Sequence, residues 1–148
     1  MPKIHPADHP ILTGSGYLPP HGAAVAGRSR IAMGAAGGLT QFGASLVTLQ
    51  PGAWSSQRHW HSAEDELVVM LSGALVLVED GGETPMMPGD IATFKAGAPD
   101  GHHLQNRSAA AATFLAIGCD RDETDECHYP DIDMFWSEAT GFTAKPQC

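Results

Sequence analysis

Short apolar runs separated by glycine, proline and aspartate occupy the middle of the chain, and this pattern predicts strands. Residues 39–49 alternate in part between apolar and polar side chains, and residues 66–71 carry valine and leucine on both faces. Further short runs lie at 57–61, 75–79, 84–87, 91–94, 102–106 and 113–119. Asp80-Gly81 is typical of a tight hairpin turn. Since no helical period is evident, the pattern predicts an all-β fold, a small antiparallel barrel or sandwich.

The two ends of the chain differ from this middle part. Residues 1–38 are rich in proline, glycine and alanine, and they predict an extended N-terminal arm with one or two short edge strands. Residues 39–119 are expected to form the barrel. Residues 120–148 begin with an acidic run, but Phe135 and Trp136 are too apolar for a free tail, so we expect this segment to pack on the barrel. A chain of 148 residues fits a single domain.

Composition and charge narrow the expected partners. The formal net charge is −9 with only 8 lysines and arginines, which argues against nucleic acid and anionic membranes. The chain has 3 cysteines without C-x-x-C spacing, which indicates reduced thiols. A disulfide between Cys119 and Cys127 is the alternative that the sequence does not exclude. There is neither a signal-peptide pattern nor an apolar run of the ~20 residues that a membrane helix needs. We therefore expect a cytoplasmic protein with a small-molecule ligand.

Candidate chemistry is concentrated in residues 52–73. His59 and His61 are two residues apart, so on a strand their side chains point to the same side, roughly 6.8 Å apart along the backbone. Two such imidazoles can bind one metal ion, and a carboxylate from the next strand can complete the site. Imidazole and carboxylate ligands suit zinc, iron, manganese or nickel.

Three acids follow the histidine pair, and the sequence alone leaves a choice between them. Glu66 shares a strand face with Val68 and Met70, where a buried carboxylate is costly unless a cation compensates it. Glu64 has the same parity as Glu66 but lies nearer the loop, and Asp65 has the opposite parity. Glu66 is therefore favoured as the ligand.

The order and spacing of these residues resemble the cupins, whose first motif is commonly written G-x5-H-x-H-x3–4-E-x6-G. In this chain Gly52 is followed by six residues, His59, one residue, His61, four residues, Glu66, six residues and Gly73. Only the first gap departs from the motif, by one residue. The departure lengthens the turn before the histidines and leaves the ligands in register.

The second cupin motif, commonly G-x5-P-x-G-x2-H-x3-N, is matched less closely. Gly89 is followed by five residues and then by Lys95 in place of the proline. Four residues instead of two separate Gly97 from His102, and Asn106 follows at the family spacing. We expect the longer loop at 98–101 to reshape the rim of the pocket.

The resemblance implies a cupin jelly-roll barrel, also called a double-stranded β-helix, with a divalent transition metal (Zn, Fe, Mn or Ni) inside. Carried over residue by residue, the implied metal ligands are His59, His61, Glu66 and His102. The neighbouring His103 is an alternative to His102, since a strand directs one of the two inward. The further pocket candidates are Gln57, Met70, His103 and Lys95.

Cupins with similar motifs include isomerases, dioxygenases, decarboxylases and lyases, so the resemblance implies a metal-dependent enzyme acting on a small organic molecule. The alternative is a non-catalytic barrel that binds or senses a small molecule. The apolar outer face and the N-terminal arm further suggest a homodimer.

Overall fold

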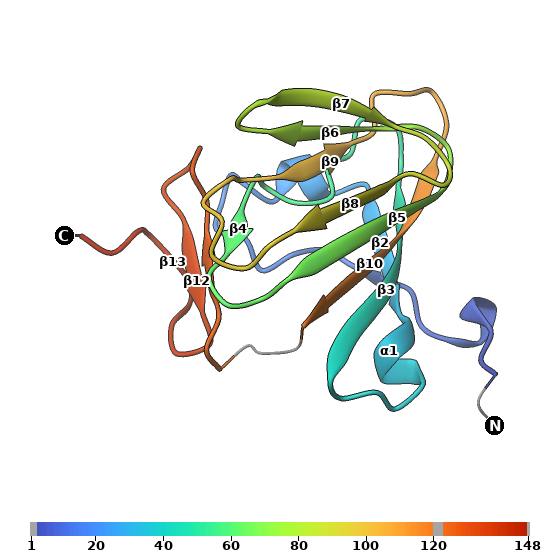
Figure 1. Ribbon diagram of the computed structural model, residues 1–148, viewed down its shortest axis with the longest axis horizontal. Helices are drawn as coiled ribbons and strands as arrows, with labels where there is room; N and C mark the ends of the chain where they lie inside the picture. The colour runs from blue at the N-terminus through green and yellow to red at the C-terminus, as the bar shows by residue number, and fades with distance from the viewer. Residues whose placement is uncertain (1–2, 120–122, 148) are drawn as a thin grey trace.

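The structure, a computed structural model, describes residues 3–119 and 123–147 and consists mainly of antiparallel strands (Figure 1). The strands are β1 (Leu12–Thr13), β2 (Arg28–Ala32), β3 (Phe42–Leu49), β4 (Trp60–His61), β5 (Glu66–Ser72), β6 (Leu75–Glu79), β7 (Gly82–Met86), β8 (Ile91–Phe94), β9 (His103–Gln105), β10 (Ala112–Cys119), β11 (Glu126–His128), β12 (Phe135–Ser137) and β13 (Gly141–Thr143). Three short helical segments are η1 (Pro6–Asp8), η2 (Ala23–Val25) and α1 (Met33–Ala36). The predicted all-β fold is confirmed, with strand boundaries shifted by a few residues.

The strands form three sheets. The largest has the order β1-β2-β3-β10-β5-β8, the second β13-β12-β11-β4, and the third β7-β6-β9. Figure 1 shows the third sheet above the largest one. Side chains from these two sheets meet in one hydrophobic core, in which Leu49 and Met70 from the large sheet join Leu75 and Leu104 from the small one. Burial of these apolar side chains is the main stabilising contribution of the barrel.

The N-terminal segment takes part in the largest sheet more than its composition indicates. β1 is an edge strand, as expected, but β2 lies inside the sheet between β1 and β3. Five residues of β2 pair with β3, from Arg28 opposite Leu49 to Ala32 opposite Ser45. Proline is absent from residues 28–32, so the backbone of β2 can donate to both neighbouring strands.

The C-terminal segment packs against the side of the barrel and forms three strands. β11 pairs with β4, which places Cys127 opposite His61 and His128 opposite Trp60. Tyr129 and Met134 are buried in a second hydrophobic cluster that includes residues of the N-terminal arm. The acidic run partly falls on residues 120–122, which are outside the described residues, as is Cys148.

The described residues contain neither the Cys119–Cys127 bridge nor a membrane-spanning helix. Cys119 and Cys127 are free thiols, so the bridge left open above is not formed. No helix in residues 3–119 and 123–147 is long and apolar enough to cross a membrane.

Candidate metal centre

Backbone pairing brings His59 and His102 together from distant parts of the chain. The two residues form an isolated antiparallel bridge, in which His59 N donates to His102 O at 3.2 Å and His102 N donates to His59 O at 2.9 Å. Directly paired residues place their side chains on the same face. The imidazole centroids are accordingly 4.9 Å apart. The predicted strand at 102–106 is shortened to β9 at this end, because His102 pairs with the irregular segment before β4.

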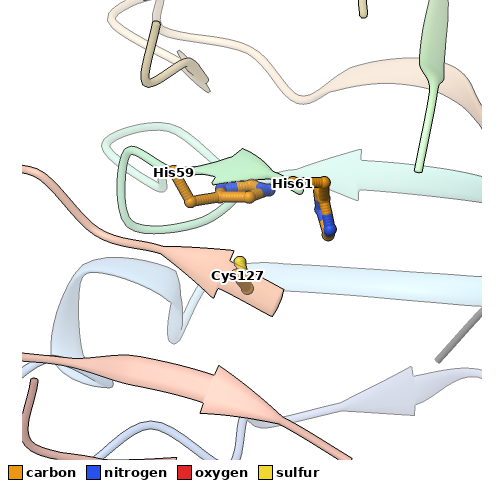
Figure 2. Close-up of side chains that lie close together, drawn as sticks. All are labelled: His59, His61 and Cys127. Carbon is orange, nitrogen blue, oxygen red and sulfur yellow. The ribbon is translucent and has the colours of Figure 1, made fainter. Parts of the chain in front are cut away.

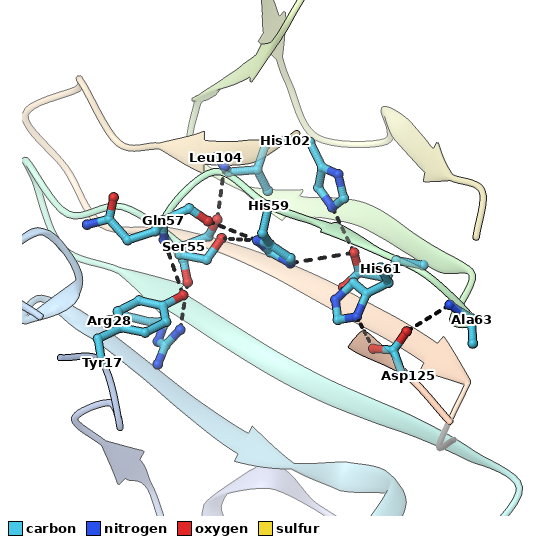
Figure 3. A network of polar contacts seen from close by, with 12 residues as sticks. Tyr17, Arg28, Ser55, Gln57, His59, His61, Ala63, His102, Leu104 and Asp125 are labelled. Atoms are coloured by element: carbon cyan, nitrogen blue, oxygen red, sulfur yellow. Dashed lines mark hydrogen bonds and ion pairs between the residues drawn. The ribbon is translucent and has the colours of Figure 1, made fainter. Parts of the chain in front are cut away.

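The carboxylate of Glu66 lies at the centre of three imidazoles. Its Oε2 is 2.7 Å from Nε2 of His102 and 3.8 Å from Nε2 of His59, and its Oε1 is 3.5 Å from Nε2 of His61. Glu66 is the first residue of β5, and His61 is the last residue of β4. Imidazoles from both motifs therefore lie around one carboxylate, and Figure 3 shows the rings of His59, His61 and His102 close together.

Hydrogen bonds on the far side of two rings fix their orientation. Nδ1 of His59 lies 2.9 Å from the backbone oxygen of Gln57, and Nδ1 of His61 lies 2.5 Å from Oδ2 of Asp125. A carbonyl or carboxylate oxygen can only accept, so each Nδ1 carries a proton and donates it. The Nε2 atoms that face Glu66 are therefore the atoms that a metal ion would bind, and at His61 the metal would replace a proton.

His102 is held mainly by packing. Its ring stacks on Phe94 with centroids 3.5 Å apart and an angle of 2°. Nε2 donates to Glu66, whereas the buried Nδ1 has no hydrogen-bond partner among the described residues. The flat ring of Phe94 thus limits rotation of His102 and keeps Nε2 directed at the carboxylate.

The pKa values of His59 and His61 are shifted in opposite directions. Burial lowers the pKa of His59 to about 4, so this ring is neutral near pH 7. Burial also opposes charge on His61, but hydrogen bonds and charge from Glu66 and Asp125 outweigh it and raise the pKa of His61 to about 9. Burial would raise the pKa of Glu66, yet hydrogen bonds from His102 and His61 hold it well below its usual value. Glu66 is therefore ionised.

These residues fit a divalent transition metal. The neutral Nε2 of His59 and Oε2 of the ionised Glu66 are both electron-rich, and they face each other at 3.8 Å without a proton between them. A cation compensates such a pair, and imidazole with carboxylate is a donor set that zinc, iron, manganese and nickel accept. His59, Glu66 and His102 place three donor atoms within 4.8 Å of one another.

A thiol lies on the other side of the histidine pair. Sγ of Cys127 and one nitrogen each from His59 and His61 also lie within 4.8 Å of one another (Figure 2). Burial raises the pKa of Cys127 to about 12, so the thiol is protonated near pH 7. The ring of Tyr129 lies beside His59, with the two ring centroids 5.8 Å apart.

Asp125 is a residue of the centre that sequence reasoning missed. Its side chain is 1% exposed, and besides His61 it accepts a hydrogen bond from the backbone N of Ala63 at 2.8 Å. In the sequence Asp125 is one of several acids in the run at 120–126, which is typical of a solvated surface. The pairing of β11 with β4 places it behind His61, and no spacing rule predicts that pairing.

The additional pocket candidates lie in different places. His103 lines the inner cavity, but both of its ring nitrogens are hydrogen-bonded within the protein. Nδ1 lies 2.9 Å from the backbone oxygen of Ser56, and Nε2 lies 2.9 Å from Nε2 of Gln105. Gln57 is buried and donates from Nε2 to the backbone oxygen of His21 at 2.9 Å, away from the centre. Met70 is 1% exposed within the core. Lys95 is exposed beside an outer cavity.

Two cavities meet at the centre. The inner cavity, about 240 Å³, is lined by His59, Glu66 and His102, and the outer one, also about 240 Å³, by His61, Glu66 and His102. The inner cavity also contains two cations and three hydroxyls that sequence reasoning did not single out: Arg28, Arg30, Ser45, Ser55 and Ser56. The arginines were missed because residues 1–38 were expected to form an extended arm with at most one or two short edge strands.

Comparisons with known proteins agree with this architecture. The Cupin_2 model, which describes the cupin domain, matches residues 45–118. A sugar phosphate isomerase of the cupin superfamily from Silicibacter pomeroyi is 47% identical, with a TM-score of 0.91 over 97% of this chain and 92% of that chain. A candidate sugar phosphate isomerase from Acidithiobacillus ferrooxidans is 28% identical, with a TM-score of 0.73 over 80% of this chain and 75% of that one.

A more distant structure shares the fold alone. A polyketide cyclase from Streptomyces resistomycificus is 16% identical, with a TM-score of 0.65 over 82% of this chain and 80% of that chain. None of the curated proteins matches the chain. The family model covers residues 45–118, which include both histidine motifs, and the nearly full-length relative at 47% identity shares the fold. The chain belongs to the cupin superfamily.

Proposed function

We propose that this cupin is a metal-dependent isomerase of a small sugar phosphate. The observation that carries the proposal is the convergence of three imidazole Nε2 atoms on the carboxylate of Glu66 beside a cavity. His59, His61, Glu66 and His102 would hold one divalent transition ion, Zn, Fe, Mn or Ni. Such an ion supplies Lewis-acid polarisation of a carbonyl or hydroxyl oxygen.

The residues around the centre suit a small polar substrate. The inner cavity of about 240 Å³ is below the range typical of drug-sized ligands. Val68, Leu104 and Phe114 form apolar walls that limit access of water, while the hydroxyls of Ser45 and Ser56 offer hydrogen bonds. A wall of this kind strengthens the electrostatic effect of every charged group inside it.

The relatives support isomerisation of a sugar phosphate over the alternatives. The protein from Silicibacter pomeroyi and the one from Acidithiobacillus ferrooxidans share that description, and the first aligns over nearly the full length of both chains. The polyketide cyclase is too distant in sequence to favour its own chemistry for this chain. The chain has only 8 lysines and arginines, but two of them, Arg28 and Arg30, line the inner cavity, where they could bind a phosphorylated substrate.

The test is a metal-dependent isomerase assay. The purified chain would be loaded separately with Zn, Fe, Mn and Ni, and metal content measured by elemental analysis. Each form would then be incubated in D₂O with pentose and hexose phosphates, and conversion and deuterium incorporation followed by NMR. We expect about one ion per chain and interconversion of an aldose and a ketose phosphate. Stoichiometric metal without turnover or deuterium exchange on any sugar phosphate would reject the isomerase, and ligand binding under those conditions would favour the non-catalytic barrel.

A further inference from the structure

Two arginines of β2 face the interior of the barrel. Arg28 and Arg30 are two residues apart, so their side chains lie on the same face of the strand. Arg28 is paired with Leu49 and Arg30 with Val47, and both partners are buried in the core. Directly paired residues of antiparallel strands share a face. The two guanidinium groups therefore lie on the inward face, although Arg30 is still exposed to solvent.

The charges of these arginines are not balanced by carboxylates of the described chain. Arg28 donates to the backbone oxygens of Ser55 at 2.7 Å and Gly14 at 3.1 Å, and Arg30 donates to Oγ of Ser45 at 3.4 Å. No ion pair of either arginine with an acid occurs within residues 3–119 and 123–147. Burial lowers the pKa of Arg28, and the nearby charge of Arg30 lowers it further. Two adjacent cations without counter-charge favour an anion between or beside them.

A second, polar cavity adjoins the same two side chains. Residues 12–16 line a space of about 220 Å³ together with Arg28 and Arg30. Thr13 and Ser15 contribute hydroxyls, and Gly14, which has no other atom within 4 Å of where a Cβ would lie, leaves the backbone open to close approach. The arginines also line the inner cavity that contains His59 and Glu66. The pair thus stands between the candidate metal centre and a polar recess that can hold several oxygen atoms.

We propose that Arg28 and Arg30, with the loop at 13–16, form the phosphate subsite of the substrate. The inference rests on the proposed isomerase function and assigns its substrate recognition to specific residues. A guanidinium group matches two oxygens of a phosphate in a planar, bidentate contact. Hydrogen bonds to Ser55 and Gly14 hold Arg28 in place, and Arg30 completes the subsite from the solvent side. The carbon chain of the sugar then extends along the inner cavity toward His59 and Glu66.

The first experiment measures catalysis by the metal-loaded protein. Arg30→Ala is preferred to a change at Arg28, whose two backbone hydrogen bonds contribute to the fold. We expect KM for the sugar phosphate to rise about 10- to 100-fold, the size of a lost charge-assisted contact. Arg30→Lys should raise KM less than Arg30→Ala does, because lysine keeps the positive charge but lacks the planar guanidinium that contacts two phosphate oxygens. Arg107→Ala is the matched control, since it removes one positive charge from an exposed pair with Glu83.

The second experiment measures binding of inorganic phosphate by calorimetry, without catalysis. Wild type and His61→Ala should bind phosphate alike, because the subsite does not need the metal, and Arg30→Ala should bind it at least tenfold more weakly. Equal phosphate binding by wild type and Arg30→Ala, or an unchanged KM in Arg30→Ala, overturns the subsite. Arg30-dependent phosphate binding in a protein that isomerises no sugar phosphate would instead retain the subsite and reject the isomerase.

Discussion

The carboxylate of Asp125 accepts a 2.5 Å hydrogen bond from Nδ1 of His61, across a separation of 64 residues. The second oxygen of the same carboxylate accepts from the backbone N of Ala63, so Asp125 fixes both the ring of His61 and the chain that follows it. The side chain is almost fully buried, which excludes water as a competing partner. The C-terminal segment thereby orients a candidate metal ligand of the first motif.

Asp125→Asn is expected to weaken metal binding without abolishing it. An amide can still contact Nδ1, but it removes the negative charge and can present the wrong atom to the ring. Loss of such a supporting carboxylate typically costs about 10- to 100-fold in metal affinity. Competition with a chromophoric chelator measures the change, and Asp8→Asn, an exposed carboxylate far along the chain, is the control. Equal affinity of wild type and Asp125→Asn would show that Asp125 has a purely structural role.

His61→Ala is expected to lose stoichiometric metal. The substitution removes one of the four donors around the centre and leaves Glu66 with one hydrogen-bonding imidazole fewer. His5→Ala removes an exposed histidine of the N-terminal arm and should keep about one ion per chain. Elemental analysis after dialysis gives the result. Full occupancy of the His61→Ala protein would exclude this histidine from the ligand set.

Gly73→Ala is expected to destabilise the fold much more than Gly52→Ala, although both glycines have positive φ. Gly73 has a φ of +77°, and an added Cβ would come within 2.7 Å of Cβ and 2.8 Å of Cα of Ala112. Gly52 has a φ of +84° with open space around it. We expect a loss of about 1 kcal/mol for Gly52→Ala from the backbone alone and about 3 kcal/mol for Gly73→Ala. Urea unfolding measures both, and equal losses would contradict the steric argument.

Asp131→Asn is expected to change how stability depends on pH. Hydrogen bonds from Arg58 lower the pKa of Asp131, so ionised Asp131 stabilises the folded state. This contribution is complete above the unfolded pKa of about 3.9 and disappears as pH falls through the lower folded value. The free energy of unfolding of wild type should exceed that of Asp131→Asn by less than about 1 kcal/mol at pH 7, because the side chain is 53% exposed.

Urea unfolding of both proteins between pH 7 and pH 2.5 tests this dependence. The difference should stay constant down to about pH 5 and then shrink. A gap between wild type and Asp131→Asn that persists unchanged to pH 2.5 would rule out the ion pair as its origin.

The residues nearest the candidate metal could be predicted because they are local in sequence or follow a fixed spacing. The alternation of a strand places His59 and His61 on one side, and the cost of burying Glu66 beside Val68 indicates a cation. His102 depends on the family resemblance, since sequence alone does not distinguish it from His103. In the structure, the antiparallel bridge between His59 and His102 places His102, and not His103, opposite His59.

The outer parts of the site could not be predicted because they depend on pairing between remote strands. Nothing local in the sequence indicates that β2 enters the sheet beside β3, so Arg28 and Arg30 were not recognised as cavity residues. Asp125 reaches His61 only through the pairing of β11 with β4. The homodimer also stays a prediction, and sedimentation at several concentrations tests it, with a purely monomeric species as the contrary result.

Because β11 pairs with β4, metal binding at His61 should change the stability of the C-terminal segment. A metal ion that binds His61 also stabilises the strand pairing in which Cys127 lies opposite His61. Part of the free energy of metal binding therefore stabilises the packing of residues 123–147 on the barrel. Conversely, a segment that detaches carries Asp125 away and lowers metal affinity by the same factor. Amide hydrogen exchange in β11 should therefore slow when the centre is filled, because β11 is paired with the strand that carries His61.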